Sequence, residues 1–173
     1  MKGKYLALAA ILGGLTFFVW GFIWHAALPV YESVMFEFGD SKLVNTVIQQ
    51  NATHGNGVYY TMEGAFVAVN FAPDMHNKEA DMMAMLPIEL VLNILTALFL
   101  AIVISKVNGC GSVMKGALFL GMLGLTAEIA IEGSYWNWYG FSTGFSLVNF
   151  VGEILAWFVA GLVIGPLYFK LNK

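Results

Sequence analysis

The sequence contains no arginine and a single cysteine. The first of these absences argues against one class of binding partner, and the second excludes one class of reaction. All eight basic residues are lysines. Arginine is the residue best suited to bidentate contacts with phosphate, so its absence argues against nucleic-acid recognition. One cysteine, Cys110, excludes an intramolecular disulfide and a CxxC redox centre. We therefore exclude nucleic acid as a partner and dithiol exchange as a reaction.

Charge is also scarce, whereas apolar residues are abundant. Of the 173 residues, 11% are charged and 59% are apolar, a balance typical of membrane proteins and not of soluble domains. A helix needs about 20 residues to cross the hydrocarbon core. Four stretches are long enough, at about 5–28, 84–105, 113–132 and 145–169. We predict one all-α membrane domain over 1–173, a four-transmembrane-helix bundle with a small lobe between its first and second helices.

The placement of lysine predicts the orientation of this bundle. Lysine-rich ends and short loops remain in the cytoplasm under the positive-inside rule. We therefore expect an integral protein of a bacterial inner membrane with both termini cytoplasmic and residues 29–83 forming an extracytoplasmic cap. Trp20, Trp24 and the aromatic run 135–139 would then belong to the outer aromatic belt. Six lysines carry the argument: Lys2, Lys4, Lys106, Lys115, Lys170 and Lys173.

Local signals predict structure within the lobe. The Asp-Ser pair at 40–41 can cap a short helix that ends near Gln50. Two β-prone runs, 58–62 and 65–71, flank a glycine-containing turn and predict a hairpin. We expect the Pro-Asp pair at 73–74 to begin a helix that continues into the second span.

Seven polar or ionisable residues interrupt the apolar spans at helical spacing. A carboxylate at bilayer depth costs roughly 2.5–3.5 kcal/mol on insertion scales, so such residues usually face a bundle interior and serve a purpose. Their spacing places the members on each helix on one face. With the orientation above, all of them fall in the outer half of the membrane, where they can converge on one pocket that opens outward: His25, Glu89, Asn93, Glu128, Glu132, Asn149 and Glu153.

Several explanations fit these residues. They could be hydrogen-bonded within the bundle and act only structurally. Carboxylates with an imidazole also suit a divalent cation or a transported proton, although the Glu-x-x-His pattern of dinuclear bundle sites is absent. A soft-metal site in the lobe is a separate alternative, because thioethers select Cu(I). Its candidate ligands are Met75, His76, Met82, Met83 and Met85.

The preferred function is that of a non-enzymatic binding or accessory protein, which holds a cation or small polar ligand or supports a larger membrane complex. Small residues along the helices favour close packing, within the bundle and against another membrane protein or a second copy. A proton-coupled or metal transporter is the second hypothesis. A metal-dependent membrane enzyme is the third, because the sequence contains no HExxH, no GxSxG and no glycine-rich phosphate loop.

The end of the first span carries a resemblance to known sequences. Residues 20–32 read WGFIWHAALPVYE, which resembles the WGxxxHxxLPxxE-like opening of a group of small bacterial four-helix membrane proteins without an assigned activity. The resemblance implies the topology and draws attention to His25, Pro29 and Glu32. Because a proline break separates them, His25 and Glu32 could meet at the membrane surface, so we add Glu32 to the candidate pocket.

Overall fold

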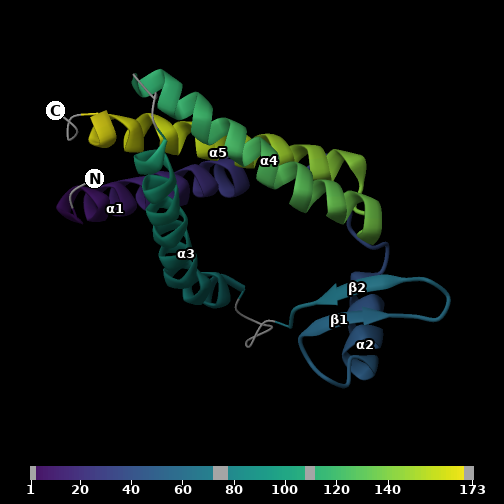
Figure 1. The fold of residues 1–173 in the computed structure, drawn as a ribbon. Helices are drawn as coiled ribbons and strands as arrows, with labels where there is room; N and C mark the ends of the chain where they lie inside the picture. The colour runs from purple at the N-terminus through teal and green to yellow at the C-terminus, as the bar shows by residue number, and fades with distance from the viewer. Residues whose placement is uncertain (1–2, 72–77, 108–111, 170–173) are drawn as a thin grey trace. The chain divides into compact units, whose positions relative to one another are not determined.

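The computed structural model of the protein describes residues 3–71, 78–107 and 112–169. The chain divides into a helical unit, Met1–Val34 with Leu86–Lys173, and a lobe, Met35–Met85. The elements follow in the order α1 (Gly3–Phe22), the π-helical turn η1 (Ile23–Ala27), α2 (Ser41–Asn51), β1 (Gly57–Tyr60), β2 (Phe66–Val69), α3 (Lys78–Lys106), α4 (Val113–Tyr139) and α5 (Thr143–Phe169), as Figure 1 shows.

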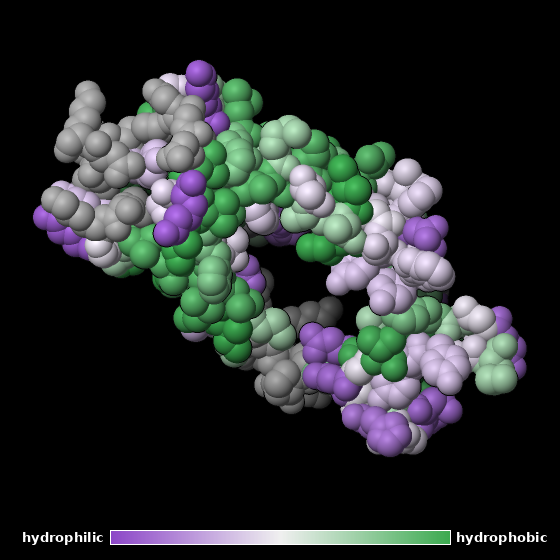
Figure 2. Space-filling model, viewed as in Figure 1, coloured by the Kyte–Doolittle hydropathy of each residue, from purple (hydrophilic) through white to green (hydrophobic). Residues whose placement is uncertain are grey.

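Four helices of the described chain are long and apolar enough to cross a membrane, as predicted. They cover Gly3–Ala27, Met83–Lys106, Val113–Tyr139 and Thr143–Tyr168. On the face shown in Figure 2, apolar residues cover most of the helical unit. Helices of this length and composition bury their side chains in lipid, so the chain is an integral membrane protein.

The end of the third span differs from the prediction. We expected the third span to end at 132 and a loop to cover 133–144, but α4 continues to Tyr139 and only residues 140–142 connect it to α5. The helix ends where Gly140 adopts a left-handed backbone, with φ 69°, a conformation that glycine takes without steric cost. The first span ends within one residue of the predicted limit, at Ala27, in the π-helical turn η1 that precedes Pro29.

The helices pack through small residues. α4 and α5 lie side by side over most of their length, and α1 lies against α5 (Figure 1). A Cβ atom added at Gly161 would lie 2.7 Å from the Cα of Ala117 on α4, and one added at Gly14 would lie 2.6 Å from the Cα of Ile94 on α3. Such close backbone approach is a main source of helix association in lipid. The buried centre consists of Ala9, Phe17, Ala97, Leu100, Ala101, Ile104, Leu120, Ala156, Ala160, Ile164 and Tyr168.

The lobe has the local structure that the sequence predicted. Asp40 caps α2, because its Oδ1 accepts a hydrogen bond of 2.8 Å from the backbone N–H of Leu43. Strands β1 and β2 form an antiparallel hairpin in which Gly57 faces Val69 and Tyr60 faces Phe66. This small sheet is an addition to the otherwise helical fold. The expected helix start at 73–74 lies outside the described residues.

Candidate functional site

Acidic residues of α3, α4 and α5 approach one another in the helical unit. Glu128 on α4 is only 6% exposed, and its charge interacts with those of Glu153 on α5 and Glu132, one turn further along α4. Glu153 is also within electrostatic range of Glu89 on α3. The predicted stripes therefore face one region, which we call the acidic cluster and define as Glu89, Glu128, Glu132 and Glu153.

One basic side chain among the described residues interacts with this cluster. It is His25 in η1, whose imidazole lies within electrostatic range of Glu89. On α3 the carboxylate of Glu89 accepts a hydrogen bond of 3.0 Å from Nδ2 of Asn93, one turn away. The first span thus contributes to the cluster through its π-helical turn, and π-helical turns recur at functional sites.

A hydrogen-bonded chain links the acidic cluster to the segment that follows η1. The hydroxyl of Tyr31 donates to Oδ1 of Asn149 on α5 over 2.5 Å. Nδ2 of Asn149 in turn donates to Oε1 of Glu132 over 3.5 Å. The second carboxylate oxygen, Oε2 of Glu132, is buried and has no hydrogen-bond partner among the described residues. Asn149 therefore binds one oxygen of Glu132, while the other stays buried and unpartnered within the described structure.

The His25–Glu32 contact that we considered from the sequence is absent. The imidazole of His25 instead stacks on the ring of Tyr31, with centroids 5.1 Å apart and an interplanar angle of 15°. Glu32 is exposed, and no ion pair joins these two described residues. The physical reason is that η1 and the turn after Pro29 bring the aromatic neighbour of Glu32 under the imidazole. Tyr31, which the sequence analysis passed over, takes the place predicted for Glu32.

The tryptophans near the end of α1 pack against α5 in addition to any role at the membrane surface. Trp20 Nε1 donates a hydrogen bond of 2.9 Å to the carbonyl of Gly152, and the ring stacks on Trp24 with centroids 5.9 Å apart. The indole of Trp24 lies against Gly152 so closely that no side chain fits there. Its Nε1 is buried without a hydrogen-bond partner in the described structure. These contacts fix η1 against the acidic cluster.

The pKa of Tyr31 reports on its partly buried position beside the acidic cluster. Burial is the main cause that raises its pKa to about 12, and the charges of Glu153 and Glu132 add to the shift. Because the folded-state pKa lies above the ordinary value of 10.0, the neutral phenol stabilises the fold below pH 10, and this contribution is lost as the pH rises through about 12.

We therefore expect Tyr31 to titrate at the alkaline end of a phenolate absorbance titration. The Tyr31→Phe variant should lose the amplitude near pH 12. Tyr60→Phe, which removes an exposed tyrosine of the lobe, should leave that part of the curve intact. Loss of amplitude from the same part of the curve in both variants would contradict the buried position of Tyr31.

The described residues do not form a multi-ligand metal centre. No group of three or more His, Cys, Asp or Glu side chains that could hold a metal ion occurs within residues 3–71, 78–107 and 112–169. Of the proposed soft-metal ligands, Met75 and His76 lie outside the described residues, as does the side chain of Met82. Met83 and Met85, near the start of α3, are 62% and 47% exposed.

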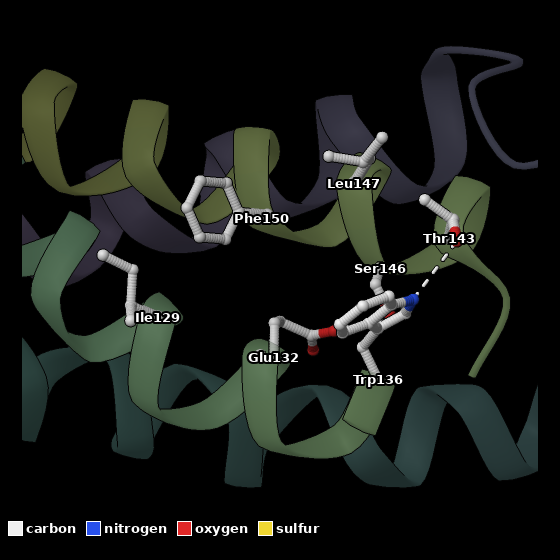
Figure 3. A pocket seen from close by; sticks show the side chains of 8 residues that line it. Ile129, Glu132, Trp136, Thr143, Ser146, Leu147 and Phe150 are labelled. Atoms are coloured by element: carbon white, nitrogen blue, oxygen red, sulfur yellow. Dashed lines mark hydrogen bonds between the residues drawn. The ribbon is translucent and has the colours of Figure 1, made fainter. Parts of the chain in front are cut away.

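A pocket of about 270 Å³ lies between α4 and α5 beside Glu132. The hydroxyl of Ser146 is buried there without a partner among the described residues, and Nε1 of Trp136 donates a hydrogen bond of 3.2 Å to Oγ1 of Thr143 (Figure 3). Sequence analysis missed Ser146, although its spacing from Asn149 and Glu153 continues their stripe. Eight residues line this α4–α5 pocket: Ile129, Glu132, Gly133, Trp136, Thr143, Ser146, Leu147 and Phe150.

Comparisons with protein families, with curated proteins and with solved structures find no match to this chain. The residues of the site itself therefore provide the basis for the function proposed below.

Proposed function

We propose that this protein is a membrane-embedded binding protein whose acidic cluster holds a small organic cation, or the protons that replace it. The observation that carries the proposal is an imbalance of charge. Four carboxylates from three apolar helices interact with one another, and the basic side chain that interacts with them in the described structure is the imidazole of His25. Like charges in a low-dielectric region repel strongly, so a bound cation stabilises the arrangement.

The surroundings of the cluster favour an organic cation over a metal ion. A metal ion of the hard, oxygen-preferring kind takes six or more ligands at close range, whereas the described residues supply no group of three candidate ligands. The ring of Tyr31 belongs to the surroundings of the cluster, since its hydroxyl is joined to Glu132 through Asn149. Aromatic faces attract ammonium groups, and such rings with carboxylates suit an ammonium ion better than a fully dehydrated metal.

The lysine distribution supports a particular orientation of the protein in the membrane. Under the positive-inside rule the termini and the α3–α4 turn face the cytoplasm of a bacterial inner membrane. An even number of spans is consistent with both termini lying on that side. The acidic cluster then belongs to the outer half of the bundle, since Glu128 and Glu132 lie in the C-terminal half of α4 and Glu153 lies in the N-terminal half of α5. In this setting the protein binds its cation from the extracytoplasmic side.

The test measures competition between a cation and protons on the full-length protein in phosphatidylcholine nanodiscs. Methylammonium chloride, added to a weakly buffered sample, should release protons, because both species compensate the same carboxylates. The double variant Glu128→Gln, Glu153→Gln lacks two of the four acids and should release roughly half as many protons or fewer.

Glu63→Gln provides the matched control, because it removes an exposed carboxylate of the lobe. This variant should release as many protons as the unmodified protein. The absence of proton release, or equal release from the double variant and the unmodified protein, would overturn the proposal.

A further inference from the structure

Large apolar side chains are exposed along the first part of the lobe. Phe36 is 83% exposed and Phe38 is 67% exposed. Met35, just before them, is also exposed, as are Leu43 and Val47 on α2. We call these five residues the apolar strip. Transfer of apolar surface out of water is favourable, so the strip is expected to have an apolar neighbour.

Local structure keeps the parts of the strip together. The hydroxyl of Ser41, the first residue of α2, donates a hydrogen bond of 3.1 Å to the carbonyl of Phe38. Leu43 and Val47 are one turn apart and lie on the same face of α2. Val44, beside them on the helix, is partly buried, whereas Leu43 and Val47 are open. α2 therefore has more apolar surface than its packing covers.

The chain enters the strip directly from the membrane-spanning unit. Val34 packs against the start of α5, since a Cβ atom added at Gly144 would lie 2.8 Å from Cγ1 of Val34. The span of α5 has 26 residues, or about 39 Å as a helix, so its ends reach the headgroup regions. Consecutive Cα atoms are about 3.8 Å apart, so the Cα of Phe36 lies within about 8 Å of that of Val34. The covalent chain therefore holds the start of the strip at the membrane surface.

The position and charge of the strip favour lipid as its neighbour. Lipid surrounds the spans, so the strip continues the surface that the protein already buries in the membrane. Phenylalanine and leucine are typical of the buried face of helices that lie in the interface between headgroups and acyl chains. Residues 35–47 contain two acids, Glu37 and Asp40, and one base, Lys42, so this segment has no attraction for anionic lipid. The contact is therefore hydrophobic, and a zwitterionic bilayer is sufficient for it.

We infer that the apolar strip anchors the lobe to the lipid surface, with Leu43 and Val47 in the boundary between headgroups and acyl chains. The rings of Phe36 and Phe38 enter the same boundary, and α2 lies along the plane of the membrane with Asn45 toward water. The inference is independent of the proposed function, because no residue of the strip belongs to the acidic cluster.

The experiment measures the depth of single nitroxide labels on the full-length protein in phosphatidylcholine nanodiscs that hold one copy each. Labels are attached through Leu43→Cys, Val47→Cys or Asn45→Cys in a Cys110→Ser background. At Leu43 and Val47 the label should collide more often with oxygen, which concentrates in lipid, than with a water-soluble nickel chelate. Asn45 is exposed on the opposite face of α2 and is the matched control, where the nickel chelate should collide more often.

A second measurement removes part of the strip and keeps the label at Val47. The double variant Phe36→Ser, Phe38→Ser should shift this label toward water, with fewer oxygen collisions and more collisions with the nickel chelate. The double variant Tyr60→Ser, Met62→Ser removes two exposed apolar side chains of the lobe outside the strip. It is the control for lost hydrophobicity and should leave the depth of the label unchanged.

Three results would overturn the inference. One is a preference for the nickel chelate at Leu43 and Val47 in nanodiscs with one copy. Another is protection of these labels only in nanodiscs with two copies, because a second copy of the chain would then cover the strip in place of lipid. The third is deeper insertion when phosphatidylglycerol replaces part of the phosphatidylcholine, since the contact would then be electrostatic. An unchanged depth in phosphatidylglycerol supports the hydrophobic contact.

Discussion

Gly161→Ala should destabilise the helical unit by about 1–3 kcal/mol, the range for overpacking in a filled core. The added methyl group would lie 2.7 Å from the Cα of Ala117 and 3.3 Å from the Cβ of Leu120. Since the nearest of these atoms belongs to the backbone of α4, relief requires the two helices to move apart. The effect is measured from the midpoint of thermal or denaturant unfolding of the purified protein in one detergent.

Gly121→Ala is the matched control at the same interface. Its added methyl group would meet the Cβ of Phe158 at 3.5 Å, an ordinary van der Waals distance. Alanine also loses less backbone entropy than glycine in a helix, by roughly 0.5–1 kcal/mol. We expect Gly121→Ala to be neutral or slightly stabilising. Equal loss of stability in both variants would mean that the close approach of α4 and α5 at Gly161 does not determine stability.

The spans could be predicted from the sequence because their signal is an average over many residues. Two less apolar residues change the mean hydropathy over about 20 positions only slightly, so α4 is recognised as a span despite the Gly-Ser pair at 133–134. The end of α4 depends on a single residue, and here the prediction was wrong. Gly133 resembles a stop signal by composition, but the left-handed backbone occurs at Gly140. A backbone angle of this kind is set by the short α4–α5 turn, which composition does not encode.

In the candidate site, too, the sequence predicts the spacing of residues along one helix but does not predict contacts between residues far apart in the chain. Spacing along one helix placed Glu128 beside Glu132 and Asn149 beside Glu153, because a helix repeats every 3.6 residues. The partnership of Tyr31 with Asn149 joins residues 118 positions apart and depends on the path of the chain through η1. No periodic pattern carries that information. The role of these residues in binding stays a prediction that the experiments above address.

Glu128→Leu should raise the stability of the protein while it reduces cation binding. Glu128 is 6% exposed, and the charges of Glu153 and Glu132 act on it. Removing a polar group from water costs about 1–3 kcal/mol unless a hydrogen bond compensates for the lost hydration, and leucine avoids this cost while filling a similar space. The gain is measured as an increase in the free energy of unfolding, and the loss of function as reduced proton release with methylammonium.

This prediction separates a binding site from a purely structural network. Residues that serve binding are often retained at a cost in stability, so their removal stabilises the fold. A carboxylate that held α4 to α5 would give the opposite result, because its loss would leave its partners unpaired. Glu63→Leu is the control for the added hydrophobicity and should change stability by less than about 0.5 kcal/mol, as is usual for exposed positions. Destabilisation by Glu128→Leu with proton release unchanged would assign Glu128 to the framework of the bundle and remove it from the acidic cluster as a binding group.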